Sequence, residues 1–240
     1  MAVQIDLNDA NSDGTGINLH AYLASFDTDF ESSVFDFGTF VGGGIFDGTQ
    51  YYMSDADSDQ AYIVGGDLQY DFFGGHVLKG DVDSVQFGED VSESGGSASL
   101  AATDIDISNL GITGSTNTDD THLVVNGLRN GDSTALRNYL DTQSVEINGS
   151  SGADVIGGFA GDDVLTGNGG ADTFEFDTSG NFGDDTVTDF TDGTDLLDID
   201  FNSVTVASAN GGADTLITHA NGTITLTGVD FNDIDATDFV

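Results

Sequence analysis

Residues 149–175 read GSSGADVIGGFAGDDVLTGNGGADTFE, three consecutive nonamers of the pattern G-x-x-G-x-D-x-U-x, in which U is a large apolar residue. Asp154, Asp163 and Asp172 recur every nine residues, and an apolar residue follows each of them at an offset of two. Glycine permits tight turns, carboxylates are hard ligands for calcium, and the apolar residue faces a core. The spacing therefore predicts coils of short parallel strands, with calcium neutralising the carboxylates that stacking brings together.

A fourth nonamer, GNFGDDTVT at residues 180–188, follows a four-residue insertion and contains Asp185. Together the repeats resemble the calcium-binding RTX β-roll of the serralysin-type secreted proteases. In that family two nonamers make one coil, so the resemblance implies one calcium site between Asp154 and Asp172 and a second between Asp163 and Asp185. Folding would then depend on calcium.

The last residues, DFNDIDATDFV at 230–240, interleave acidic and apolar side chains. They resemble the uncleaved C-terminal signal that the type I (ABC transporter) secretion apparatus reads. The alternative is a final edge strand. At the other end, residues 1–14 lack the basic and apolar regions of a secretory signal peptide. We therefore expect an extracellular protein exported by the type I route.

The charge balance limits the possible partners. The chain has 43 acidic and 3 basic residues, a formal net charge of −40. Nucleic-acid binding is excluded because it needs lysine and arginine. Because the acidic side chains repel one another, we expect the folded protein to need bound cations or high ionic strength. The simpler interpretation of the acidic composition is adaptation of the surface to salt. No stretch approaches 18 apolar residues, so we expect no membrane insertion, and a monomer.

Several kinds of catalytic site are excluded by missing residues. There is no cysteine, hence no disulfide or thiolate chemistry. The motifs H-E-x-x-H and G-x-S-x-G are absent, and the four histidines are scattered along the chain. Two acidic runs, residues 9–14 and 55–59, lack the full set of EF-hand ligands and are expected to be turns. We expect a protein without catalysis.

The preceding part of the chain has a mixed pattern. Apolar residues have helical spacing at 17–26 and again at 119–141, where Gly131 interrupts them. Between these stretches, residues 49–89 contain short strand-like segments joined by Gly or Asp turns. We predict an α+β domain at residues 1–145, with an antiparallel sheet and a few helices, followed by an all-β parallel roll at residues 146–240.

Three segments carry a further resemblance: QYYMSDADSDQAYIVGGDLQYDFFGGHVLKGDVDSVQFGED at 50–90, NLHAYL at 18–23 and THLVVNGLRNGDSTAL at 121–136. In this order they resemble the HasA-type bacterial haemophores, haem acquisition proteins with a curved antiparallel sheet. The resemblance implies haem bound through Tyr70, with His76 hydrogen-bonded to the phenolate and with Phe72 and Phe73 as apolar walls. It also implies delivery to an outer-membrane haem receptor.

Such a ligand pair makes chemical sense. Ferric iron favours an anionic oxygen, but free tyrosine has a pKa of about 10, so a histidine that accepts the phenol proton makes the ligand available near neutrality. The interval from Tyr70 to His76 is two residues shorter than in the family. The histidine that the family uses on the loop after its first helix is missing, because none occurs between Ala21 and Gly75.

We therefore expect one-sided ligation by Tyr70, with Phe35, Phe37 or Phe40 covering the opposite haem face. His20 and His122 match helix positions that are structural in the family. Arg129 stands where the family has an apolar haem contact, and it either pairs with a haem propionate or is an exposed helix residue. The alternative for the whole protein is a calcium-stabilised structural or adhesive protein whose haemophore-like domain binds no haem.

Overall fold

The computed structural model describes residues 1–10, 14–32 and 37–240. They form two compact units, one of residues 21–139 with Met1 and one of residues 2–20 with 140–240. The sequence analysis instead placed residues 1–145 in one domain. The difference is that residues 2–20 pack with the C-terminal part, so that the first unit is an insertion within the second. In the described part of the chain, no helix is long and apolar enough to span a membrane.

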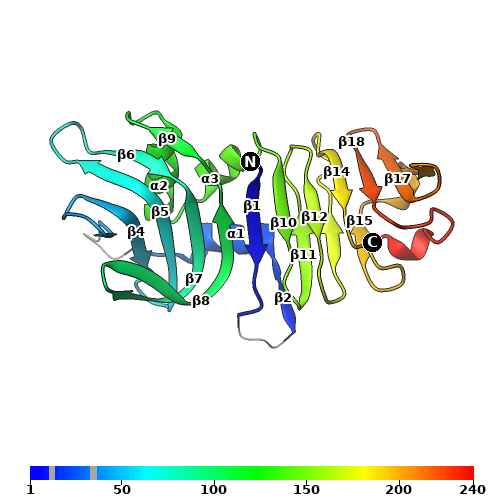
Figure 1. Cartoon of the computed structure of the whole chain (residues 1–240), viewed down its shortest axis with the longest axis horizontal. Coiled ribbons are helices and arrows are strands. Elements are labelled where there is room, and N and C mark those ends of the chain that lie inside the picture. Colours follow the sequence, from blue (N-terminus) through cyan, green and yellow to red (C-terminus); the bar gives the residue numbers. More distant parts are fainter. Residues whose placement is uncertain (11–13, 33–36) are drawn as a thin grey trace. The chain divides into compact units, whose positions relative to one another are not determined.

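The first unit contains one antiparallel sheet and three helices (Figure 1). Its elements are α1 (Leu19–Asp29), β3 (Thr39–Val41), β4 (Asp47–Ser54), β5 (Gln60–Asp71), β6 (Val77–Val82), β7 (Ser84–Ser94), β8 (Ser97–Ser108), β9 (Ile112–Gly114), α2 (Asp120–Arg129) and α3 (Thr134–Leu140). The strands β3, β4, β5, β7 and β8 pair in this order. A second branch, β6 with β9, extends from β5.

Strand β5 organises the sheet because it changes partners halfway along. Residues 60–65 pair with β7, whereas residues 68–71 pair with β6. Gly66 lies at the change, with φ 151°, and a Cβ there would meet the Asp81 carbonyl oxygen at 2.1 Å. Only glycine allows this close approach. As a result, the last residues of β5 and the loop after them project beyond β7.

Aromatic packing joins α1 to the sheet. Phe26 on α1 is fully buried and meets Tyr62 of β5 and Phe87 of β7 at ring-centroid distances of 5.9 and 5.2 Å. It also stacks on Phe30 at 4.8 Å. Edge-to-face and stacked contacts of this kind add about 0.5–1.5 kcal/mol per pair beyond area burial. This cluster forms the core of the first unit.

Local sequence patterns correctly predict some helices and strands of the first unit but not others. The predicted helical region at 119–141 is α2 and α3, separated at Gly131, which has φ 66°. The first helix starts at Leu19, because Ile17 belongs to a strand. Strand β8 was not predicted, and two predicted strands form the single strand β5.

The second unit is built of short strands. They are β1 (Val3–Leu7), β2 (Thr15–Asn18), β10 (Val145–Asn148), β11 (Ala153–Gly157), β12 (Val164–Thr166), β13 (Thr173–Glu175), β14 (Gly183–Val187), β15 (Leu196–Asp198), β16 (Thr205–Ala209), β17 (Asp214–His219) and β18 (Gly222–Leu226). Short 3-10 helices occupy Phe201–Ser203 and Ala236–Asp238. Near the C-terminus, Phe239 forms only an isolated bridge, to Leu197.

Alternate strands of the repeat region pair in parallel and form two ladders (Figure 1). One ladder contains β1, β10, β12, β14 and β18, and the other contains β2, β11, β13 and β15. Ile156 pairs with Phe174, 18 residues later, so two nonamers separate strands of one ladder. Leu165 pairs with Val187 because the four-residue insertion lengthens that step. The apolar residues at the U positions, Ile156, Leu165 and Phe174, are fully buried.

Residues 2–20 supply the first strand of each ladder. Strand β1 pairs with β10, Val3 opposite Val145, and β2 pairs with β11. Gly16 on β2 is crowded, since a Cβ there would lie 2.3 Å from both the carbonyl carbon and oxygen of Ala153. The N-terminal segment therefore extends the repeat region by one further layer.

This crowding predicts that Gly16→Ala forces β2 away from β11 and destabilises the second unit. Overpacking of this kind costs about 1–3 kcal/mol, which differential scanning calorimetry of the full chain would detect as an earlier transition. Gly180→Ala is the matched control, because a Cβ at exposed Gly180 would meet no atom within 4 Å. Equal transition temperatures for both variants would contradict the packing of β2.

Candidate functional site

The loop between β5 and β6 is held by its first residue, Asp71. One carboxylate oxygen accepts the Gly74 N–H at 2.6 Å, and the other lies 3.2 Å from the Lys79 ammonium. These two donors, the backbone N–H first, hold the pKa of the exposed Asp71 carboxyl below its ordinary value. The loop closes as Asp71 pairs with Val77. Five residues, 72–76, are thus fixed at the end of a two-stranded projection.

Within this projection, Tyr70 and His76 meet. Tyr70 Oη lies 2.6 Å from His76 Nδ1, a short hydrogen-bond distance. His76 has φ 60° and follows Gly75 at φ 102°, so its backbone adopts the left-handed conformation that non-glycine residues rarely use. A hydrogen bond from its backbone N–H to the Asp71 carbonyl, at 3.0 Å, supports this conformation. The backbone strain at His76 turns its imidazole toward the phenol.

A cavity of about 350 Å³ opens beside Tyr70. This volume is within the range typical of sites for small molecules and cofactors. Among the described residues the lining is apolar and aromatic apart from Tyr70, His76 and Arg129, and none of them is Asp or Glu. The lining residues are Phe37, Gly38, Phe40, Ile45, Phe46, Tyr51, Tyr70, Phe72, His76, Leu78 and Arg129.

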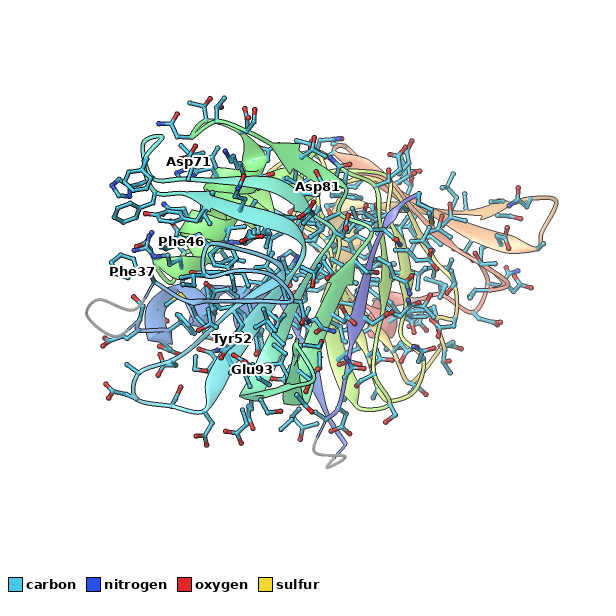
Figure 2. All side chains as sticks on the ribbon, turned by 60° about the vertical axis from the view of Figure 1, so that its left-hand side comes forward. Phe37, Phe46, Tyr52, Asp71, Asp81 and Glu93 are labelled. Carbon is cyan, nitrogen blue, oxygen red and sulfur yellow. The ribbon has the colours of Figure 1, made fainter. Side chains whose placement is uncertain are left out.

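One wall is made of stacked rings. Phe46 and Phe72 stack with centroids 5.9 Å apart and an interplanar angle of 24°, and Phe46 lies 6.1 Å from the Tyr70 ring. Figure 2 shows Phe46, Phe37 and Asp71 along one edge of the first unit. Phe46 and Phe72 are each 48 % exposed, so large apolar surface faces solvent at this cavity.

The opposite wall is held by Tyr51 of β4. Its hydroxyl donates to the Phe37 carbonyl at 2.9 Å, and its ring is 1 % exposed. Gly38 packs so close that a Cβ would lie 2.3 Å from the Tyr51 ring, and its φ is 70°. These contacts fix the segment that carries Phe37 and Phe40 over the cavity.

Arg129 enters the cavity from the last turn of α2. Its guanidinium carbon lies 5.2 Å from the centre of the Phe37 ring, a cation–π distance. Its Nε is buried and, among the described residues, has no hydrogen-bond acceptor. The other two basic residues form ion pairs, Lys79 with Asp71 and Arg137 with Asp27.

The structure brings most of the sequence-derived haem-site residues together. Tyr70, His76, Phe72 and Arg129 all line the cavity. Phe73, which was expected to form a wall, does not line the cavity, because it is 96 % exposed at the tip of the loop. Phe46 lines the cavity instead. Phe37 and Phe40 line the cavity as expected, whereas Phe35 lies outside the described residues.

Five lining residues were not predicted from the sequence: Gly38, Ile45, Phe46, Tyr51 and Leu78. Leu78 pairs with Tyr70 across β5 and β6, and Phe46 is tied to Tyr70 because the Tyr70 N–H donates to the Phe46 carbonyl at 2.7 Å. Strand register, which is not visible in the sequence, decides both contacts. The one available signal was the aromatic enrichment of residues 40–52.

Two histidines outside the cavity have structural contacts. His122 Nδ1 accepts the Leu78 backbone N–H at 3.1 Å, and burial lowers the pKa of His122 below its ordinary value of 6.5. His20 Nε2 lies 3.1 Å from the Gly158 carbonyl oxygen, and its ring is edge-on to Phe159. Neither residue lines the cavity.

In the second unit, the repeat aspartates are buried within the two ladders. Asp154, Asp163, Asp172 and Asp185 are each at most 3 % exposed. Asp172 accepts the Asp154 N–H at 2.9 Å, and Asp185 accepts the Asp163 N–H at 3.0 Å, so the structure brings together both pairs that the repeat implied. Each contact joins a carboxylate to a backbone amide of the preceding layer.

These carboxylates differ in how completely they are satisfied. Asp163 accepts two amides, from Val145 and Phe159, whereas the second oxygen of Asp185 has no partner among the described residues. Burial raises the pKa of Asp163 and Asp172 to about 6 and that of Asp185 to about 8. In the described part of the chain no group of three or more His, Asp or Glu side chains is arranged to hold a metal ion.

The contact between His122 and Leu78 predicts a pH effect on the first unit. Because the folded pKa of His122 is lowered, its contribution to stability is complete above pH 6.5 and is lost as the pH falls through the folded pKa. Lowering the pH from 7.5 to 5 should therefore destabilise the wild type more than His122→Gln, whose amide oxygen accepts without titrating. Thermal unfolding at the two pH values measures this difference; equal pH dependence in both proteins would refute it.

The comparisons with known proteins agree with the fold. The family model described as heme-binding protein A (HasA) matches residues 27–167. A curated relative, hemophore HasA of Serratia marcescens, is 31% identical over 154 residues, which cover 55% of this chain and 80% of the relative. Solved structures of holo and apo hemophore HasA from Yersinia pestis both have TM-scores of 0.50, at 24% and 25% identity, and each comparison covers 58% of this chain and 88% of the other. The chain therefore belongs to the heme-binding protein A (HasA) family.

Proposed function

We propose that this protein is an extracellular haemophore that binds haem through Tyr70 and passes it to a cell-surface receptor. The observation that carries the proposal is the 2.6 Å contact between Tyr70 Oη and His76 Nδ1 at the edge of an apolar, aromatic cavity. A tyrosine paired with a histidine in a cavity of this kind suits ferric iron and a flat apolar ring. Membership of the heme-binding protein A (HasA) family supports haem as the bound group.

His76 makes the phenol a usable ligand. A neutral imidazole accepts the phenolic proton through Nδ1, and the resulting phenolate offers the hard anionic oxygen that ferric iron favours. The hydrogen bond also sets the direction of the Tyr70 oxygen, as partners of metal ligands do elsewhere. Release of haem would follow when His76 is drawn away, because reprotonation of Tyr70 weakens the bond to iron.

The cavity suits the shape of a porphyrin. Phe46 and Phe72 provide a stacked apolar wall on one side, and Phe37 and Phe40 lie on the segment held by Tyr51 on the other. His20 and His122 lie outside the cavity. We therefore propose ligation of iron by Tyr70 alone, with an aromatic cover on the opposite face.

Replacing the ligand should abolish most haem affinity. Tyr70→Phe keeps the ring but removes the oxygen, so hemin affinity, measured by the absorbance of the Soret band, is expected to fall by on the order of 100-fold or more, beyond the effect typical of a partner of a metal ligand. Tyr52→Phe is the matched control, because Tyr52 donates to Glu93 at 2.7 Å and does not line the cavity (Figure 2).

Equal affinities in the two tyrosine variants would contradict ligation by Tyr70. An absence of saturable hemin binding in the wild type would favour the alternative, a calcium-stabilised structural or adhesive protein with a haemophore-like domain.

Removing the proton acceptor should weaken hemin binding at the same site. In His76→Ala the phenol loses the hydrogen-bond partner that accepts its proton and directs its oxygen, so hemin affinity is expected to fall about 10–100-fold. A hemin titration followed by Soret absorbance measures this. An unchanged affinity would mean that His76 does not tune Tyr70.

We also propose that the repeat region is an RTX-type β-roll that binds calcium. The support is the second oxygen of Asp185, which has no partner among the described residues and belongs to a residue only 2 % exposed, since a buried carboxylate oxygen needs a donor or a cation. Asp154 and Asp163 have amide donors on both oxygens, so Asp185, with Asp163 beside it, is the position that most needs a cation. Asp172 would pair with Asp154 in the neighbouring ladder. Calcium would supply positive charge to these layers when bound.

Calcium should therefore stabilise the second unit. For a dissociation constant of about 10⁻⁴–10⁻³ M, 10 mM calcium adds about 1.4–2.7 kcal/mol per site. Asp185→Asn should reduce this gain, measured as the calcium-dependent shift in unfolding temperature. Glu146→Gln, an exposed position on β10, is the charge-matched control. An equal calcium shift in both variants would refute a site at Asp185.

Such a calcium requirement fits export through a type I apparatus. The repeat region would remain unfolded at cytosolic calcium concentrations and would fold outside the cell. The resemblance of residues 230–240 to a type I signal supports this route. Delivery to an outer-membrane receptor follows from the proposed haemophore role.

A further inference from the structure

Among the residues that the structure describes, Arg129 is the basic residue without a carboxylate partner, in a chain rich in carboxylates. The sequence has 43 acidic residues, and two of its three basic residues are paired with aspartates. Within the described ranges, Arg129 has no carboxylate within ion-pair distance, and its buried Nε has no acceptor. Its one side-chain hydrogen bond to a described residue runs from Nη1 to the Asn126 amide oxygen at 3.4 Å, which is long. Most of the five guanidinium donors are thus available to a ligand.

The surroundings of Arg129 direct these donors toward the cavity. The Phe37 ring lies 5.2 Å from the guanidinium carbon and lines the same cavity. The residue occupies the last turn of α2, where the helix dipole favours a positive charge. Among the described lining residues Arg129 is the cation and none is Asp or Glu, so these residues offer an anion in the cavity a positive partner and no carboxylate.

We infer that Arg129 binds a carboxylate of the ligand, and so selects porphyrins that carry free propionates and sets which edge of the ring enters first. This role rests on the proposed haem site and accounts for the specificity of that site for porphyrins with free propionates. Arginine suits this task because its planar fork binds both oxygens of one carboxylate.

This contact matters because the rest of the protein repels the ligand. Hemin carries two propionates, and a chain of net charge −40 disfavours the approach of any anion. Salt screens the distant charges over about 10 Å at 0.1 M ionic strength, but a partly buried contact is screened much less. The local attraction of Arg129 therefore determines how the propionate edge of hemin is oriented in the cavity.

The test compares hemin with hemin dimethyl ester, which has the same iron and ring but no propionate charge. Both are delivered from dimethyl sulfoxide at 0.15 M salt, and the affinities are measured by Soret absorbance for wild type, Arg129→Met and Arg137→Gln. Hydrogen bonds to charged groups lead us to expect about a tenfold or greater loss of hemin affinity in Arg129→Met. Affinity for the ester should be nearly unchanged.

Arg137→Gln removes the same charge from a residue that lies outside the cavity and pairs with Asp27, so it should leave the ratio of hemin to ester affinity as in the wild type. Arg129→Lys should restore part of the ratio, because it keeps the charge but loses the bidentate fork. If Arg129→Met weakens both ligands equally, or neither, carboxylate recognition by Arg129 is wrong. If neither ligand binds the wild type saturably, the proposed haem function fails instead.

Discussion

The supply of donors for carboxylates is the constraint on which both units depend, because the chain has 43 acidic residues and 3 basic ones. In the second unit the donors are backbone amides: each buried aspartate of a ladder accepts an N–H from the preceding layer, as Asp172 does from Asp154. A β-ladder provides such amides at regular intervals, so the repeat can bury carboxylates without lysine or arginine. Among the described residues, the second oxygen of Asp185 has no such partner.

The first unit meets the same constraint by keeping carboxylates out of its cavity. Asp71 stays at the exposed edge, where the Gly74 N–H and the Lys79 ammonium bind its carboxylate, and none of the described lining residues is Asp or Glu. A neutral phenol can stand in an apolar site without a counter-ion. In the proposed haem site His76, held in a left-handed backbone conformation 2.6 Å from the phenol oxygen, would accept the phenolic proton when iron binds.

The parts of the structure that local patterns determine could be predicted from the sequence. The nonamers specify their own strands, and the burial of Ile156, Leu165 and Phe174 follows from period and composition. The resemblance to haemophores also directed attention to Tyr70 and His76. Long-range pairing was not predictable: nothing near Val3 indicates that it pairs with Val145, and thus that residues 2–20 belong to the second unit. The same limit explains Phe46, which replaces Phe73 as a wall because the hydrogen bond between Tyr70 and Phe46, rather than sequence neighbourhood, decides which ring reaches the cavity.

Resonance Raman spectroscopy of the hemin-loaded protein, prepared with ordinary and with isotopically labelled tyrosine, tests the central claim most directly. The account predicts an iron–phenolate vibration that shifts with the label and a five-coordinate, high-spin ferric iron, because Tyr70 is the one protein ligand and aromatic rings cover the other face. A six-coordinate, low-spin spectrum without any band that responds to labelled tyrosine would contradict it.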